Sequence, residues 1–199
     1  MQKTYTILLL FAVSLLNSMA QGTAFARGAD VSWCTEMEAD GRVFRNAEGT
    51  ETELFALMKQ IGMTAIRLRV WVNPVRFGYG AWSDKADVLA KAKRAHAQGL
   101  DLMIDFHYSD FFADPGTQNT PLDWADYPMD QLKTAMTAHT RDMLQTLKNE
   151  GIEPRWVQVG NETNSGMLNP LGKIDRCLRR LPEQTSGISP SNRTVKLLN

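Results

Sequence analysis

A strand–helix alternation with a repeat of about 36 residues is the strongest constraint on how this chain can fold. Apolar runs with a period of two begin near residues 29, 64, 100 and 154, and runs with helical spacing separate them. Strands that alternate with helices form a parallel sheet with right-handed crossovers, and helices must cover such a sheet. The pattern therefore predicts an α/β fold.

The expected elements follow from these periods and from the residues that flank them. A capping box at Thr50 and Glu53 predicts the start of the first long helix. Ser83 and Asp130 are expected to open the second and third helices, and a glycine closes each of the three. The four expected strands cover residues 29–33, 64–72, 100–107 and 155–160.

Two architectures are open for such a sheet: a doubly wound sheet and a (β/α)8 TIM barrel. Arg69, His107 and Glu162 lie at the carboxyl ends of three strands, where a barrel places its active site. The first strand is not followed by a glycine-rich phosphate loop, which counts against a dinucleotide-binding sheet. We therefore expect a barrel, although a complete one needs about 250 residues and only the first four βα strands are recognisable.

The balance of charge excludes one class of partner. Lysine and arginine total 22, aspartate and glutamate also total 22, and the formal net charge is zero. A nucleic-acid partner is therefore not expected. Cys34 and Cys177 lack metal-site spacing and are too few to staple a small domain by disulfides.

The first 26 residues are predicted to be a secretory signal peptide. Ile7 to Leu16 is almost entirely apolar, Lys3 precedes it, and Ala24-Phe25-Ala26 fits a cleavage site. The alternative, a membrane anchor, needs about 20 apolar residues, which is more than this run supplies. We expect a cleaved signal, a secreted or periplasmic protein, and no stable membrane anchor.

The segment 157–164 carries the strongest sign of chemistry. A β-branched strand runs into Gly160, which permits a tight turn, and then presents Asn161 and Glu162 at the strand end. A carboxylate there can protonate a leaving-group oxygen if burial or a second carboxylate raises its pKa. The neighbouring amide can hydrogen-bond a sugar hydroxyl. The alternative is that both residues merely cap the next helix.

The segment 105–115 interleaves polar groups with aromatic rings, a composition that suits the binding of sugars. Two other interpretations remain open for it. Asp105, His107 and Asp110 have the chemistry of a metal site, and the segment also fits a polar loop without any ligand.

Arg67 and Arg69 alternate with aliphatic residues in the second strand, so both side chains point to one face. Interior guanidinium groups require carboxylate partners. Arg69 is expected to orient a catalytic carboxylate, whereas Arg67 fits a structural salt bridge at least as well. Trp33 and Trp71 fit sugar stacking and core packing equally.

Four ordered motifs together resemble glycoside hydrolase family 53, the endo-β-1,4-galactanases. They are GADVSWCTEMEADG, IRLRVWVNP, DFHYSDFFADPGTQNTPLDW and VQVGNETNSGMLNPLGK. The resemblance implies a secreted, retaining (β/α)8 glycosidase, with residues 27–172 as the amino-terminal half of the barrel. Its polymer substrate would be the β-1,4-galactan of type I arabinogalactan, found in pectin side chains.

The resemblance also implies roles for individual residues. Glu162 would be the proton donor, Asn161 would bond the 2-hydroxyl of the sugar, and Arg69 and His107 would support the catalytic carboxylates. The expected substrate-binding residues lie at the end of the second strand and in the loop after the third: Trp71, Asp110, Asp114, Pro115, Gly116 and Thr117.

Residues 173–199 depart from the family pattern, as a truncated or frame-shifted reading frame would. The family's nucleophilic glutamate ends strand seven, and no segment after Lys173 resembles strands five to eight, so we expect the nucleophile to be absent from this chain. Neither a cofactor nor a metal is expected: the calcium that some bacterial relatives bind is held by later loops without counterpart here. The alternative function is a truncated, non-catalytic fragment that binds galactan weakly or does not fold.

Overall fold

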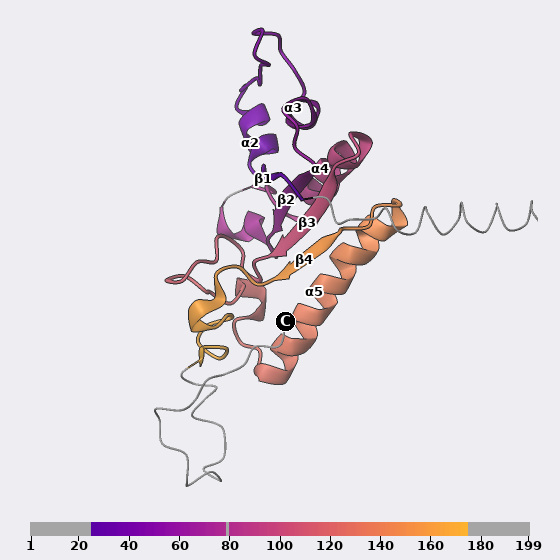
Figure 1. Ribbon diagram of the computed structural model, residues 1–199. Helices are drawn as coiled ribbons and strands as arrows, with labels where there is room; N and C mark the ends of the chain where they lie inside the picture. Colours follow the sequence, from indigo (N-terminus) through magenta and orange to yellow (C-terminus); the bar gives the residue numbers. More distant parts are fainter. Residues whose placement is uncertain (1–24, 79, 175–199) are drawn as a thin grey trace, which may run out of the picture.

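A computed structural model describes residues 25–78 and 80–174, and a parallel four-stranded sheet lies at its centre (Figure 1). The sheet order is β1-β2-β3-β4, the same as the order in the chain. This confirms the predicted parallel sheet, with each strand shorter than the apolar run that predicted it. The strands are β1 (Gly28–Asp30), β2 (Ala65–Val70), β3 (Asp101–Phe106) and β4 (Trp156–Val159).

Helices connect consecutive strands and cover one face of the sheet. In the described residues they are α2 (Cys34–Ala39), α3 (Leu54–Gln60), α4 (Lys85–Ala97) and α5 (Met129–Asn149). Helix α4 packs on β2 and β3 and also against α5. Helix α2 was not predicted, because six residues are too few to show a helical period.

Short 3-10 helices follow three of the strands and form part of the loops at their carboxyl ends. They are η1 (Pro74–Phe77), η2 (Leu122–Trp124) and η3 (Thr163–Ser165).

The expected helix starts are wrong by one to three residues. The capping residue of α3 is Glu53 rather than Thr50, because the Glu53 carboxylate accepts the amide hydrogen of Ala56 at 2.8 Å. Asp84 rather than Ser83 caps α4. Helix α5 begins one residue before Asp130 and has no side-chain cap. Glu53 and Asp84 each accept a hydrogen bond from the backbone amide three residues later, which is the spacing of an N-cap.

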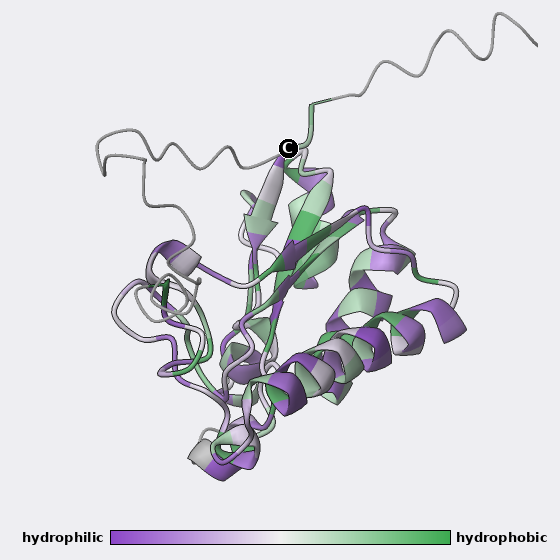
Figure 2. Ribbon diagram, turned by 90° about the horizontal axis from the view of Figure 1, so that it is seen from below, coloured by the Kyte–Doolittle hydropathy of each residue, from purple (hydrophilic) through white to green (hydrophobic). Residues whose placement is uncertain are grey.

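The hydrophobic core lies between the sheet and its helices. Ile66, Leu68 and Ile104 project from the strands and are fully buried, and each contributes about 1.5–3 kcal/mol by leaving water. Figure 2 shows hydrophobic residues along the strands and mixed polar and apolar residues along the helices. Lys91 is also fully buried on α4, and its ammonium group donates to the carboxylate of Asp87 at 2.5 Å.

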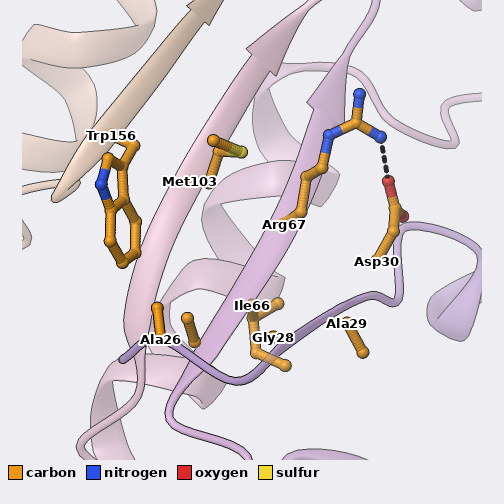
Figure 3. Close-up of a pocket in the computed structure, with 9 residues that line it drawn as sticks. Ala26, Gly28, Ala29, Asp30, Ile66, Arg67, Met103 and Trp156 are labelled. Atoms are coloured by element: carbon orange, nitrogen blue, oxygen red, sulfur yellow. Dashed lines mark hydrogen bonds and ion pairs between the residues drawn. The ribbon is translucent and has the colours of Figure 1, made fainter. Parts of the chain in front are cut away.

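The other face of the sheet, here called the inner face, is the one that a closed barrel would enclose. Arg67, Met103 and Trp156 are neighbours across β2, β3 and β4 and share this face. Near the amino ends of the strands they line an open pocket of about 320 Å³ together with Ala29 and Asp30 (Figure 3). Toward the carboxyl ends of the strands, the side chains on the inner face are mostly polar.

The sheet has two unpaired margins in the part of the chain that the structure describes. Strand β1 pairs only with β2, and β4 pairs only with β3. Val157 and Val159 lie on the face of β4 opposite the inner face, and they are 41% and 54% exposed. Between residues 25 and 174, position 79 aside, no helix is long and apolar enough to cross a bilayer. The expected signal peptide and the segment after residue 174 lie almost entirely outside the described residues.

Candidate active site

The carboxyl ends of β2, β3 and β4 bring together the polar residues that the sequence singled out. The strand register pairs Arg69 with Asp105, and Asp105 with Gln158 on the next strand. His107, Asn161 and Glu162 follow one to three residues after the strand ends. The strand register therefore brings these residues to the same rim of the sheet, as predicted.

Arg67 is the centre of the polar network on the inner face. Its guanidinium donates to Asp30 at 2.7 Å, an ion pair visible in Figure 3, and to the buried carboxylate of Asp105 at 2.5 Å. The same group also donates to the side-chain oxygen of Asn161 at 2.8 Å. The salt-bridge interpretation of Arg67 is thus correct but incomplete, because the arginine also orients Asn161.

Three neighbours fix the side-chain amide of Asn161. Its oxygen accepts from Arg67 and also from the Gln158 amide at 3.1 Å, and its nitrogen donates to the Ala113 carbonyl at 2.7 Å. One of the two amide hydrogens remains for another acceptor. The arrangement therefore presents a preoriented donor at the rim.

His107 is held in one tautomer. Its Nδ1 accepts the amide hydrogen of Ala113 at 3.0 Å, so the proton lies on Nε2, which faces Asp105 at 3.0 Å. The ring is 2% exposed. Ala113 thereby links His107 to Asn161, since its amide binds the histidine and its carbonyl binds the asparagine.

Glu162 occupies a strained turn and projects to the surface. Its backbone is in the left-handed region, with φ 48° and ψ 47°, directly after Gly160 and Asn161. It stands at the start of η3, yet its side chain makes no capping hydrogen bond, which contradicts the interpretation of Glu162 as a helix cap. The exposed carboxylate is available to a ligand.

Arg69 lies beneath a cover of aromatic rings. Its guanidinium carbon is 4.0 Å from the ring centre of Trp33, 4.5 Å from Phe112 and 4.9 Å from Trp71. Burial lowers the pKa of Arg69 to about 10. Two of its nitrogens, Nε and Nη2, are buried without a hydrogen-bond partner among the described residues. Such a group is costly unless a carboxylate pairs with it.

The two tryptophans have different environments. Trp71 is 1% exposed and belongs to the packing beneath the rim, whereas Trp33 is 37% exposed. The sugar-stacking interpretation therefore fits Trp33 better than Trp71, since a buried ring offers no face to a ligand.

The loop after β3 holds the other predicted binding residues, and several of them build the loop itself. Asp110 accepts the amide hydrogens of Asn73 and Leu122, and burial raises the pKa of this carboxyl. Asp114 accepts the amide hydrogens of Gly116 and Thr117 within a tight turn. Asp110 thus binds the backbone through both carboxylate oxygens and Asp114 through Oδ1, and their expected role in substrate binding stays a prediction.

A pocket of about 370 Å³ lies beside this loop. It is lined by Asp110, Phe112, Thr117, Asn169 and other residues of the loops after β3 and β4. Within the described residues, no group of histidine, cysteine and acidic side chains is arranged to hold a metal ion. The metal interpretation of the segment 105–110 therefore has no geometric support there.

Pro115 and Gln118 connect this loop to the one that carries Glu162. The carbonyl of Pro115 accepts from the Ser165 hydroxyl at 3.2 Å. The Gln118 side chain donates to the carbonyls of Asn161 and Glu162. Sequence reasoning missed Gln118 because only folding brings it to residues more than 40 positions away, and no local pattern marks it.

The fold and the rim define this class of protein: the first four βα units of a (β/α)8 barrel, with a carboxylate beside an anchored amide at the end of β4. The profile of glycosyl hydrolase family 53 matches residues 26–197, and the chain belongs to this family. The match extends into the segment after residue 172.

Curated relatives support the same family. An endo-β-1,4-galactanase of Bacillus subtilis is 38% identical over 157 residues, which are 77% of this chain and 37% of the relative. An arabinogalactan endo-β-1,4-galactanase A of Aspergillus niger is 35% identical over 191 residues, 94% of this chain and 53% of the relative. The chain thus spans about half or less of the length of these relatives.

Solved structures agree with the fold. A fungal β-1,4-galactanase superposes with a TM-score of 0.71 at 37% identity, over 75% of this chain and 44% of that protein. The family 53 catalytic domain of Ignisphaera aggregans gives a TM-score of 0.72 at 34% identity, over 77% and 44%. The predicted barrel fold is confirmed for the described part.

Proposed function

We propose that this chain supplies the acid/base half of a secreted endo-β-1,4-galactanase. The observation that carries the proposal is the exposed Glu162 carboxylate next to the anchored Asn161 amide at the rim of a family 53 half barrel. The names of the bacterial and fungal relatives support galactan as the substrate. The polymer would be type I arabinogalactan, as in pectin side chains.

In this mechanism Glu162 protonates the glycosidic oxygen as the bond to the sugar breaks. The free hydrogen of the Asn161 amide bonds the 2-hydroxyl, an interaction that strengthens in the transition state. A retaining reaction also requires a nucleophilic carboxylate about 5–5.5 Å from the acid. That carboxylate attacks the anomeric carbon and forms a glycosyl-enzyme while the protonated leaving group departs. Water then gives its proton to Glu162, attacks the same carbon and breaks the bond to the nucleophilic carboxylate. Carboxyl groups perform every step, so the proposed reaction requires no metal or cofactor.

Arg69 lies too deep to meet a carboxylate that arrives from outside the described residues. Its nitrogens Nε and Nη2 have no hydrogen-bond partner among those residues, but both are buried under the aromatic cover and the residue is only 3% exposed. Its expected role in orienting a catalytic carboxylate therefore stays a prediction.

Export is part of the same proposal, because galactan is an extracellular polymer. The apolar run Ile7–Leu16 would direct secretion, with cleavage near Ala26. Amino-terminal sequencing of the exported protein checks this: a first residue near Arg27 is expected, and an intact Met1 would refute cleavage.

The Glu162→Ala variant tests the acid role, in the chain completed by the carboxyl-terminal half of a family relative. Hydrolysis of galactan should fall about 100-fold or more, because general acid catalysis typically contributes that much. Hydrolysis of an aryl galactoside with a dinitrophenolate leaving group, measured as kcat/KM, should fall far less, since that group departs without a proton. Glu153→Ala, at another exposed glutamate, is the control. Equal losses on both substrates would refute the acid role.

A further inference from the structure

Gln118 is a buried polar residue that the proposed mechanism does not use. It lies in the loop between β3 and η2 and is 2% exposed. Buried side-chain amides are kept in proteins when their hydrogen bonds are satisfied, because an unpaired amide is costly to bury. The partners of this amide therefore indicate what Gln118 does.

Those partners are the backbone carbonyls on both sides of the candidate acid. The Gln118 amide nitrogen is 2.7 Å from the oxygen of Asn161 and 3.2 Å from the oxygen of Glu162. It is also 3.1 Å from the oxygen of Asp114, in its own loop. One nitrogen with two hydrogens is thus shared among three acceptors, two of which belong to the turn that carries the catalytic carboxylate.

The turn at Glu162 needs support of this kind. A non-glycine residue in the left-handed region is strained and persists only when its surroundings hold it there. The orientations of the carbonyls before and after Glu162 are set by the same backbone angles that aim its Cα–Cβ bond. A donor that binds both carbonyls therefore fixes the direction of the Cα–Cβ bond from which the carboxylate extends.

The backbone of Gln118 is also bonded to the loop after β4, beyond the turn at Glu162. Its carbonyl accepts the amide hydrogen of Asn169 at 2.7 Å, and the Thr120 hydroxyl donates to the Asn169 carbonyl at 2.8 Å. Asn119 and Asn169 form a parallel bridge between the two loops. The loop that carries Gln118 is thus joined to the loop after β4 at two places, the turn at Glu162 and the segment at Asn169.

We propose that Gln118 is a positioning residue for the acid/base carboxylate of Glu162. The inference rests on the proposed function, since it assigns Gln118 a part in the same reaction. Gln118 touches no reacting atom; it acts through the backbone of Glu162. Its loss should misdirect the proton donor while leaving the sugar-binding surface in place.

The kinetic test compares two variants in the chain completed by the second half of a family barrel. Gln118→Met keeps the length of the side chain but cannot donate, and Gln145→Met removes an exposed glutamine on α5 as the matched control. For Gln118→Met, kcat/KM on galactan should fall about 30- to 100-fold, the loss expected when a catalytic group is displaced by about 1 Å. With a dinitrophenyl galactoside the fall should stay below about threefold, because this leaving group needs no proton.

A second measurement uses the 199-residue chain itself. Hydrogen–deuterium exchange of the amides at 160–166 should be faster in Gln118→Met than in the unmodified chain and unchanged in Gln145→Met. Similar exchange in all three proteins would overturn the anchoring role, and so would equal kinetic losses on the two substrates. If the unmodified completed barrel does not hydrolyse galactan, the proposed function fails, while the exchange measurement still decides whether Gln118 holds the turn.

Discussion

Arg67 is the residue on which the inner face of the sheet depends most. It pairs with Asp30 and with Asp105, whose side chain is fully buried, and it orients Asn161. Arg67→Met should lower the free energy of unfolding by about 3 kcal/mol, because the buried carboxylate of Asp105 loses its charged partner and keeps only the imidazole of His107. Chemical denaturation measures this loss.

The control for that prediction is an exposed arginine that bridges strands at the same sheet. Arg155 pairs with Asp101, and both side chains are about two-fifths exposed. Arg155→Met should cost less than about 1 kcal/mol, as exposed ion pairs do. Equal losses in the two variants would contradict the central role of Arg67.

His139 makes the stability of the fold depend on pH. Its ring packs against Phe106, Tyr108 and Trp124, and its Nε2 is buried without a partner among the described residues. Burial lowers the pKa of His139 from 6.5 to about 4, although Asp142 opposes the shift. Between these values the unfolded chain binds the proton and the folded chain does not. Stability is therefore complete above about pH 6.5 and falls toward pH 4, by at most about 3 kcal/mol.

Removing the imidazole should remove this pH dependence. In His139→Met the difference in unfolding free energy between pH 7 and pH 4.5 should shrink, whereas His96→Met, at an exposed histidine on α4, should leave it unchanged. Denaturation curves at both pH values provide the comparison. An unaltered slope in His139→Met would show that other groups cause the acid loss.

At the scale of elements, the turn from β4 into η3 requires glycine at position 160. The residue has φ +85°, and an added Cβ would lie 2.6 Å from the Thr163 methyl group and 2.9 Å from the end of Met167. Gly62 has nearly the same φ, but an added Cβ there would meet nothing within 4 Å. The two glycines therefore separate backbone strain from steric contact.

Alanine at each position should show the difference. Gly62→Ala should cost about 1–2 kcal/mol, the penalty for a side chain in the left-handed region. Gly160→Ala should cost at least about 1 kcal/mol more, because the β-branched Thr163 must leave its rotamer. Urea denaturation measures both costs, and indistinguishable values would mean that the turn adjusts freely.

Elements with long apolar periods could be predicted from the sequence, and contacts between distant loops could not. The helix expected from Asp130 onward is α5, because a helix of 21 residues shows its apolar period clearly; Leu132, Met143 and Leu147 are its buried side chains. Helix α2 was not predicted because it has only six residues. At the site, Glu162 was found through its motif, whereas Gln118 escaped because its role depends on partners brought near only by the fold.

At the scale of the whole molecule, the open margins of the sheet predict how the chain behaves alone. Among the described residues, strands β1 and β4 each have an unpaired edge. The retaining mechanism also requires a second carboxylate, which Glu162 cannot replace. The 199-residue chain alone should release no reducing sugar from β-1,4-galactan. Co-expression with the carboxyl-terminal half of a family barrel should restore hydrolysis. Robust turnover by the chain alone would mean that another carboxylate serves as the nucleophile.

The hydrogen bonds between the loops after β3 and β4 also restrict how these loops can move. Gln118, Thr120 and Ser165 join the two loops at separate points, so the loops must move together or not at all. The part of the rim formed by these two loops is therefore stiff. In the proposed function, a bent or branched polysaccharide would therefore have to be accommodated by movement of other loops around the rim.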